Sequence, residues 1–274
     1  MSGFSEARVV RFGPSQRRSS ELLRSLAWDL RFATWRVQLI LEFIRHYHLH
    51  STEPPPRSGD TLDWLALMRH HGAPTRLLDF TFSFPVASYF ALSKKPCEDA
   101  DPVVWAVNKT WLTRIMEKWS VKASGRKKRF ADLATYRDGK AFRELFLKRD
   151  PKLVLSASPF RRNQRLEIQS GIFLCPGNVE LPLMALLRNL EGKDKDEKRE
   201  NYEKNVLKIP IAAGKRNALL RGLDQAGISH ASLFPGLDGF AESLRTKVLL
   251  FEHLRQMEKN KARGNLSIAL LDRW

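Results

Sequence analysis

Apolar residues recur at helical spacing in three segments of the first third of the chain. This spacing predicts helices over residues 20–50, 62–70 and 84–92. Gly72 ends the second of these stretches, as glycine often does just beyond a helix. Pro85 suits the first turn of the third, which is almost entirely apolar, so we expect that helix to be buried.

Other segments have the composition or the alternation of strands. We expect strands at residues 8–12, 102–107, 153–155, 165–174 and 206–211. The β-branched content of residues 102–107 indicates a central strand, and residues 153–155 suit a sheet edge. Residues 165–174 alternate apolar and polar positions, with Gly171 as a bulge.

The remaining segments predict helices between these strands. We expect surface helices over residues 109–120 and 137–148, a helix over 215–225, and a final helix after the turn at 234–240. Residues 190–205 are dense in charge and fit either a solvated helix or a flexible loop.

Helices and strands mix along the chain without the strict alternation of a doubly wound fold. This order favours an α+β fold with a mixed central sheet and surrounding helices. We expect a single domain over residues 1–274 with its core at about 40–244, the N-terminal strand and helix packed on it, and a C-terminal helical extension.

The charge balance points to a polyanionic partner. The chain has 47 Lys plus Arg against 30 Asp plus Glu, a formal net charge of +17. Such a surface attracts nucleic acid, although a merely solvated cationic surface has the same composition. The basic clusters that we expect to contact nucleic acid are Arg126, Lys127, Lys128 and Arg129, and Arg161, Arg162 and Arg165. Without a visible zinc finger or RNA-recognition motif, contact with the phosphate backbone is expected.

Several classes of protein are disfavoured. The apolar runs are too short to cross a bilayer and the first residues lack a signal-peptide core, so we expect a cytoplasmic protein. The two cysteines, Cys97 and Cys175, fit ordinary thiols. Only His46 and His50 of the nearby histidines would share a helical face, so no metal site is expected. Phosphate loops of the Rossmann or Walker type and a nucleophile elbow are also missing from the sequence.

Residues 70–92 are the most informative segment, because polar groups there adjoin a buried helix. Arg76 follows a tight Gly-x-Pro turn and can either grip a phosphate or form a buried salt bridge with Asp79. His70 and His71 can donate to a ribose or phosphate, or serve the fold alone.

The string from His70 to Asp79, His-His-Gly-Ala-Pro-Thr-Arg-Leu-Leu-Asp, resembles the signature of the FRG domain family. Residues 163–173 resemble the family's second block, and residues 207–244 resemble its tail. Two positions depart from the pattern. Arg69 stands where the family has glutamine, and Arg11-Phe12-Gly13 has the composition of the Phe-Arg-Gly triplet in another order.

The resemblance implies a layout similar to ADP-ribosyltransferases and NAD-dependent transfer of ADP-ribose, in a toxin or anti-phage setting with a possible antitoxin as partner. The basic surface points to DNA as the acceptor. For that activity we assign Gln169, Glu167 and Arg76 to catalysis. The residues assigned to NAD binding are Arg11, His70, His71, Gly72, Thr75, Arg76, Asp79, Tyr89 and Phe173. The alternative function is a non-catalytic module that binds DNA, a nucleotide or a partner.

The assignment of Glu167 and Gln169 to catalysis assumes that residues 165–174 form a strand. On a strand, Glu167 and Gln169 would project to one face. A carboxylate can stabilise the oxocarbenium-like state formed when NAD is cleaved, and a neighbouring amide can orient the acceptor. An exposed strand face is the plainer interpretation of Glu167.

Overall fold

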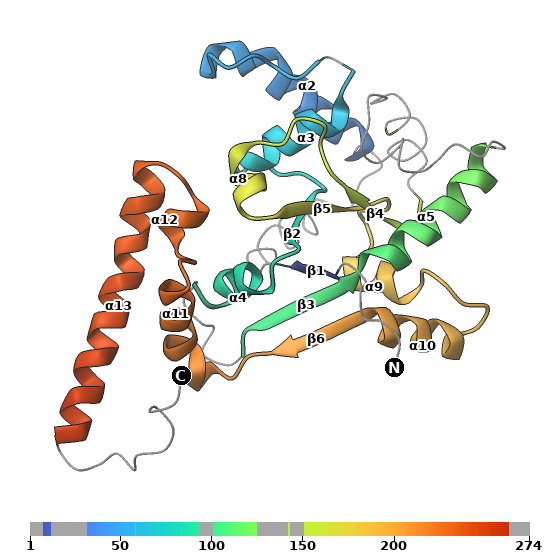
Figure 1. The fold of residues 1–274 in the computed structure, drawn as a ribbon. Coiled ribbons are helices and arrows are strands. Elements are labelled where there is room, and N and C mark those ends of the chain that lie inside the picture. Colours follow the sequence, from blue (N-terminus) through green and yellow to red (C-terminus); the bar gives the residue numbers. More distant parts are fainter. Residues whose placement is uncertain are drawn as a thin grey trace.

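Six strands form one sheet at the centre of the molecule (Figure 1). The computed structural model describes residues 8–11, 32–57, 59–93, 101–124, 142 and 151–262. The strands, in the sheet order β4-β5-β2-β1-β3-β6, are Val154–Ala157, Gly171–Pro176, Leu78–Thr81, Arg8–Arg11, Val103–Asn108 and Val206–Pro210. Every pairing is antiparallel. The α+β class is therefore confirmed, whereas the prediction of a mixed sheet is wrong for the described strands.

The N-terminal strand β1 lies inside the sheet. It pairs with β2 on one side, where Arg11 opposes Phe80, and with β3 on the other, where Arg11 opposes Trp105. The predicted strand at residues 8–12 is confirmed, and β3 is an interior strand as expected. β4 and β6 form the two edges.

The two faces of the sheet are covered by different helices (Figure 1). On one face lie α3 (Thr61–His70) and α4 (Phe84–Ser93), packed on side chains such as Phe173 and Val104. On the other lie α5 (Lys109–Ser124) and α9 (Leu183–Arg188), packed on Phe80 and Leu174. Because successive strand residues alternate between faces, Asp79 shares the α3 face with its cross-strand partner Phe173.

Helix α2 (Phe32–His50) packs on α3 through aromatic rings. Tyr47 meets Trp64 edge to face with the ring centroids 5.5 Å apart. The described part of the predicted helix over residues 20–50 is therefore confirmed, and residues 20–31 lie outside the described residues. Of the predicted helix at 137–148, only Phe142 is described, and it is buried.

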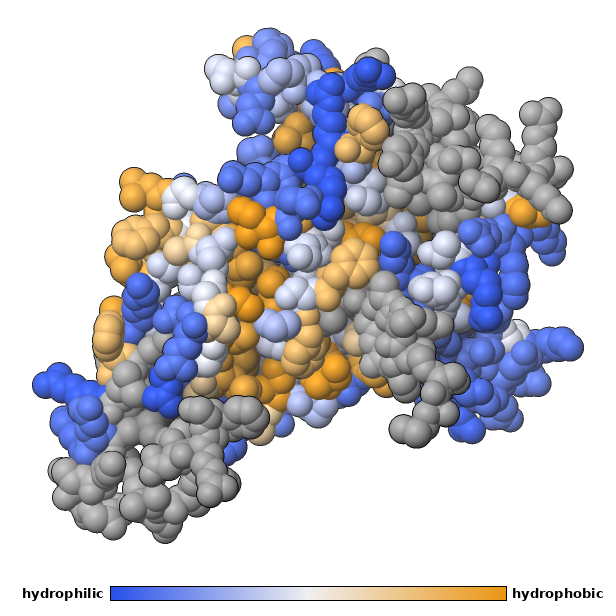
Figure 2. Space-filling view, in the orientation of Figure 1, coloured by the Kyte–Doolittle hydropathy of each residue, from blue (hydrophilic) through white to orange (hydrophobic). Residues whose placement is uncertain are grey.

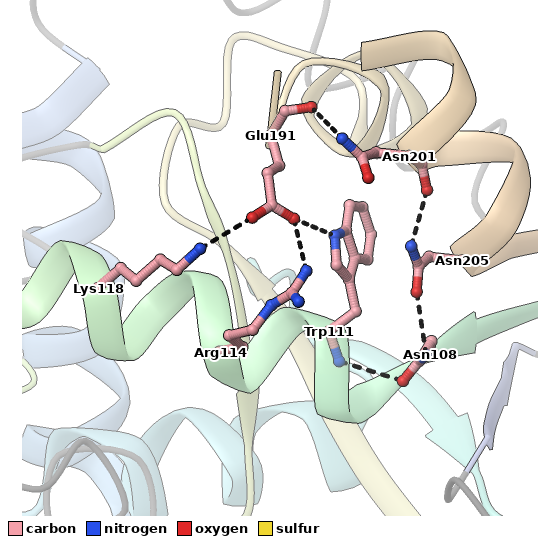
Figure 3. Close-up of polar contacts among 7 residues, drawn as sticks. All are labelled: Asn108, Trp111, Arg114, Lys118, Glu191, Asn201 and Asn205. Atoms are coloured by element: carbon pink, nitrogen blue, oxygen red, sulfur yellow. Dashed lines mark hydrogen bonds and ion pairs between the residues drawn. The ribbon is translucent and has the colours of Figure 1, made fainter. Parts of the chain in front are cut away.

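The charge-dense segment after residue 190 is fixed rather than loose (Figure 3). It forms helix α10 (Lys195–Asn205), and the carboxylate of Glu191 accepts hydrogen bonds from Trp111, Arg114 and Lys118 of α5. Burial opposes ionisation of Glu191, but these donors outweigh it and lower the pKa of the carboxyl. Of the two predicted alternatives for residues 190–205, the helix is the one found.

The C-terminal part forms a separate group of helices beside α4: α11 (Arg216–Gln225), α12 (His230–Leu233) and α13 (Leu237–Ala262) (Figure 1). A short 3-10 turn, η2 (Ala213–Lys215), precedes α11. Leu220 and Leu233 pack with Tyr89 of α4 in a small core. Among the described residues, no helix has both the length and the apolar character that crossing a bilayer requires.

Candidate functional site

The signature loop joins α3 to β2 and is held by its own backbone and by β5. Gly72 has φ of 80°, a left-handed conformation that glycine adopts without strain. The Thr75 hydroxyl accepts a hydrogen bond from the Leu77 amide at 3.3 Å, and Leu77 is completely buried. The loop is therefore anchored in the core at its C-terminal end.

Arg76 does not pair with Asp79, so the predicted salt bridge is wrong. Its guanidinium donates to the carbonyls of Pro176 at 3.3 Å and Gly177 at 3.0 Å. The strand register explains this contact. Leu78 opposes Leu174, so residue 76 lies beside the end of β5. Arg76 thus binds the loop to β5.

Asp79 instead pairs with Arg69, the residue that departs from the family pattern. The Arg69 Nε donates to Asp79 Oδ2 at 2.8 Å, and the second contact of the guanidinium, to the same oxygen, is 2.5 Å. The side chains are 22% and 28% exposed. A charge-assisted pair of this kind connects the end of α3 to the middle of β2.

The second motif block forms a helix where a strand was predicted. Helix α8 spans Gln164–Ile168, and the Asn163 side chain caps it by accepting from the Leu166 amide at 2.7 Å. Gly171 is the first residue of β5 rather than a bulge, and a Cβ there would lie 2.4 Å from Leu166 Cδ1. A side chain at residue 171 would therefore displace Leu166, so glycine suits the close approach of α8 to β5.

As a result, Glu167 and Gln169 do not share a face. Glu167 is exposed and pairs with Arg162 at 2.9 Å. Gln169 is 5% exposed, and its side-chain nitrogen donates to the Leu233 carbonyl at 3.0 Å. Its own carbonyl accepts from the Thr81 hydroxyl at 2.6 Å. Gln169 thus ties α8 to β2 and to α12.

Gln169 and Arg76 lie at opposite ends of the β2–β5 pair. Thr81 bonds to residue 169, whereas residue 76 adjoins residue 176. Five residues of extended strand span about 16 Å. The structure therefore does not bring the three predicted catalytic residues together.

A different set of side chains converges near α8, at the Gln169 end of the β2–β5 pair. The Arg165 guanidinium lies over the Phe234 ring, 4.3 Å from its centroid, and the His230 ring stacks on Phe234 with the centroids 4.1 Å apart. Burial lowers the pKa of Arg165, Asp79 opposes that shift, and Arg69 adds to it. Arg165 therefore lies within electrostatic reach of the Arg69–Asp79 pair.

His70 belongs to the same neighbourhood. Burial lowers the pKa of His70, and the charges of His71 and Arg165 lower it further. Burial also lowers the pKa of His230, with Glu242 acting against the shift and Arg165 adding to it. The Asp79 cluster, as we define it, consists of Arg69, His70, Asp79, Arg165, His230 and Phe234, each only partly buried.

The other predicted binding residues lie elsewhere or inside the core. Tyr89 is 2% exposed between α4 and α12, and Phe173 is 3% exposed under α3. Burial raises the pKa of Tyr89. Arg11 lies on β1 with its backbone opposite Phe80, one residue from Asp79.

The predicted nucleic-acid residues do not share one surrounding in the structure. Arg161 is exposed, and its amide hydrogen-bonds to the Asp63 carboxylate at 3.4 Å. Arg162 reaches the Gly171 carbonyl at 3.0 Å and therefore helps to hold α8 on β5. Arg165 is in the Asp79 cluster. The last group, residues 126–129, lies outside the described residues.

The Asp79 cluster draws one side chain or more from each of the three motif blocks that the sequence suggested. Arg69 directly precedes the signature, and His70 and Asp79 are its first and last residues. Arg165 comes from the second block, and His230 and Phe234 come from the tail. Residues 11–100 match the sequence profile of the FRG domain. The chain therefore contains an FRG domain over residues 11–100. The FRG match begins at Arg11, the last residue of β1, and includes α2, α3, β2 and α4, so it contains both members of the Arg69–Asp79 pair. No curated protein and no solved structure matches the chain.

Within the FRG domain and its continuation, the Asp79 cluster combines guanidinium groups with flat rings at a partly accessible position. Guanidinium groups bind phosphate in a bidentate manner, and aromatic faces bind planar bases. The cluster holds two guanidinium groups, Arg69 and Arg165, and one carboxylate, Asp79, so positive charge exceeds negative charge within it. The arrangement is therefore suited to an anionic ligand that also carries a planar ring.

Proposed function

We propose that the protein is an ADP-ribosyltransferase that takes NAD as its substrate and nucleic acid, with DNA first, as its acceptor. The observation that supports this most is the half-buried Arg165 guanidinium over the Phe234 ring, beside a second arginine, Arg69. NAD offers a pyrophosphate to the cations and planar rings to the aromatic side chains.

The acceptor is proposed from charge. A formal net charge of +17 favours association with a polyanion, and Arg161 and Arg162 lie next to α8, which carries Arg165. Nucleic acid bound there would lie close to the Asp79 cluster.

For the transfer step we propose Glu167 as the carboxylate that stabilises the sugar cation. Its ion pair with Arg162 is exposed, and exposed pairs contribute only about 0–1 kcal/mol, so the carboxylate can exchange partners at little cost. Gln169 and Arg76 then act by positioning α8 and the signature loop rather than by touching NAD.

A second candidate function is a non-catalytic module that binds a nucleotide or nucleic acid at the same cluster. It is favoured by the fact that both carboxylates considered for this site, Asp79 and Glu167, are ion-paired. Binding of NAD without its consumption would characterise this module.

The decisive experiment incubates the protein with NAD and separate samples of single-stranded DNA, duplex DNA and RNA, and weighs each nucleic acid by mass spectrometry. We expect a gain of one ADP-ribose in at least one sample. Arg165→Gln should abolish NAD binding and transfer.

Arg188→Gln is the matched control, because Arg188 also lies over an aromatic ring, Tyr202, at 5.4 Å. It should bind and transfer like the parent. NAD binding with no modified acceptor and no released nicotinamide would favour the non-catalytic module, and no NAD binding by the parent would exclude both uses of NAD.

A further inference from the structure

Five large apolar side chains of helix α13 are exposed. Leu237, Phe240, Leu244, Val248 and Phe251 are 80%, 50%, 44%, 55% and 67% exposed. Two small side chains of α13 face the protein body: Ser243 is 3% exposed, and Thr246 adjoins Tyr89. Figure 2 shows hydrophobic side chains gathered along the left of the molecule, over α12 and α13.

The outward residues form one narrow stripe. At 100° per residue they fall within an arc of about 80°, and their mean spacing of about 3.5 residues is that of the seam between two paired helices. Exposed apolar surface of this kind marks an interaction site. We refer to these residues as the α13 stripe.

The order of residues in the α13 stripe identifies the partner. The intervals read the same in both directions around Leu244, with Phe240 and Val248 on either side and Leu237 and Phe251 at the ends. An antiparallel second copy would therefore place Leu244 on Leu244, Phe240 on Val248 and Leu237 on Phe251. A two-fold axis requires such self-complementarity.

Charge along α13 favours the same arrangement. Residues 237–243 contain two acidic residues, Asp238 and Glu242, and no Lys or Arg. Residues 245–262 contain five Lys or Arg and two Glu. Antiparallel pairing about Leu244 places Glu242 of one helix opposite Thr246 of the other, beside Arg245 and Lys247, and it also aligns the helix dipoles favourably.

We propose that the protein forms a homodimer through antiparallel pairing of the α13 stripe with the stripe of a second copy. This inference is independent of the proposed function. The Asp79 cluster adjoins α12, the helix that precedes α13, so the dimer would hold two such clusters in one particle.

Sedimentation equilibrium of the full chain tests the proposal. We expect a dimer at tens of micromolar, and Leu244→Lys should weaken it by about 100-fold or more, because two lysines would meet at the axis. Leu39→Lys on α2 is the matched control, since Leu39 is also 44% exposed, and it should remain dimeric. A monomeric parent at 100 μM, or a dimeric Leu244→Lys variant with native circular dichroism, would overturn the proposal.

Cross-linking tests the direction of pairing. Leu244→Cys should form an intermolecular disulfide under mild oxidation, and so should the double variant Phe240→Cys with Val248→Cys. Phe240→Cys alone should not, because antiparallel pairing separates it from its own copy by about 12 Å along the axis. The parent, whose Cys175 is buried, serves as the background control. Efficient cross-linking of Phe240→Cys alone would contradict the antiparallel arrangement.

Discussion

Arg69 shows how much depends on a single residue. The family pattern has a neutral amide at this position, and here a cation binds the Asp79 carboxylate. The pair is only partly buried. Removing Arg69 would therefore leave the Asp79 carboxylate unpaired and partly shielded from water, which costs less than an unpaired charge deep in the core.

We predict that Arg69→Met lowers the free energy of unfolding by about 1–3 kcal/mol, because Asp79 loses its charge-assisted hydrogen bonds. Arg69→Gln restores the family residue and can still donate one hydrogen bond, so its loss should be smaller. Urea denaturation of both variants measures the difference. Equal stability of Arg69→Met and the parent would show that the pair does not hold β2 to α3.

The histidines of the Asp79 cluster make stability depend on pH. Burial lowers the pKa of His70 and of His230 from the ordinary value of 6.5. The unfolded chain therefore binds these protons at higher pH than the folded one. We predict that the free energy of unfolding falls as pH drops below about 6.5, until the folded histidines also titrate. The free energy of unfolding should fall less between pH 7.5 and 5.5 in the double variant His70→Gln with His230→Gln. If the double variant lost as much stability over this range as the parent, the prediction would be wrong.

At the scale of elements, the sequence predicted regular pieces better than their junctions. Residues 84–92 and 102–107 were assigned correctly because long apolar or β-branched runs leave few alternatives. Residues 165–168 were assigned wrongly because so short a run fits both periods. The helix is stabilised by the Asn163 cap and by the contact of Leu166 with β5. Of these two features, only the cap can be predicted from the local sequence.

The same limit applies to the candidate site. The signature predicted that residues 69–79 matter, but the partner of Asp79 depends on how α3 lies on β2. Phe234 and His230 were read only as part of a turn and the family tail. Their stacking on each other and against Arg165 is a contact between distant segments, which no local spacing encodes.

The Gln169 side chain helps to hold α8 in place by its hydrogen bond to α12. We predict that Gln169→Ala lowers the free energy of unfolding by about 1–3 kcal/mol, because the buried Leu233 carbonyl loses its donor. NAD affinity should fall as well, since Arg165 and Phe234 would lose their alignment. Glu167→Gln is the control on the same helix, with an expected stability change under about 0.5 kcal/mol. If Gln169→Ala kept full stability, the tether between α8 and α12 would be unimportant.

At the scale of the whole molecule, charge dominates behaviour in solution. The net charge of +17 is spread over clusters that lie both inside and outside the described residues. Long-range attraction to phosphates does not depend on any single arginine.

We predict DNA binding that weakens at least about tenfold between 50 and 200 mM salt, because each phosphate contact releases counterions. Fluorescence anisotropy with a labelled duplex measures the slope. Replacing Arg126, Lys127, Lys128 and Arg129 together with glutamine should make the slope shallower. Affinity that is indifferent to salt, or no binding at low ionic strength, would contradict the prediction.

The position of β1 has a consequence for how the sheet is assembled. Among the described strands, this short strand alone joins the β4-β5-β2 half of the sheet to the β3-β6 half, because β2 and β3 do not pair with each other. Its partners follow much later in the chain, so the sheet closes through contacts of large sequence separation, which slows folding. Until β1 inserts, two strand edges with free amides and carbonyls face each other across a gap. Each is a template for pairing with another chain. Deleting the N-terminal strand should therefore leave secondary structure largely in place and increase aggregation during refolding.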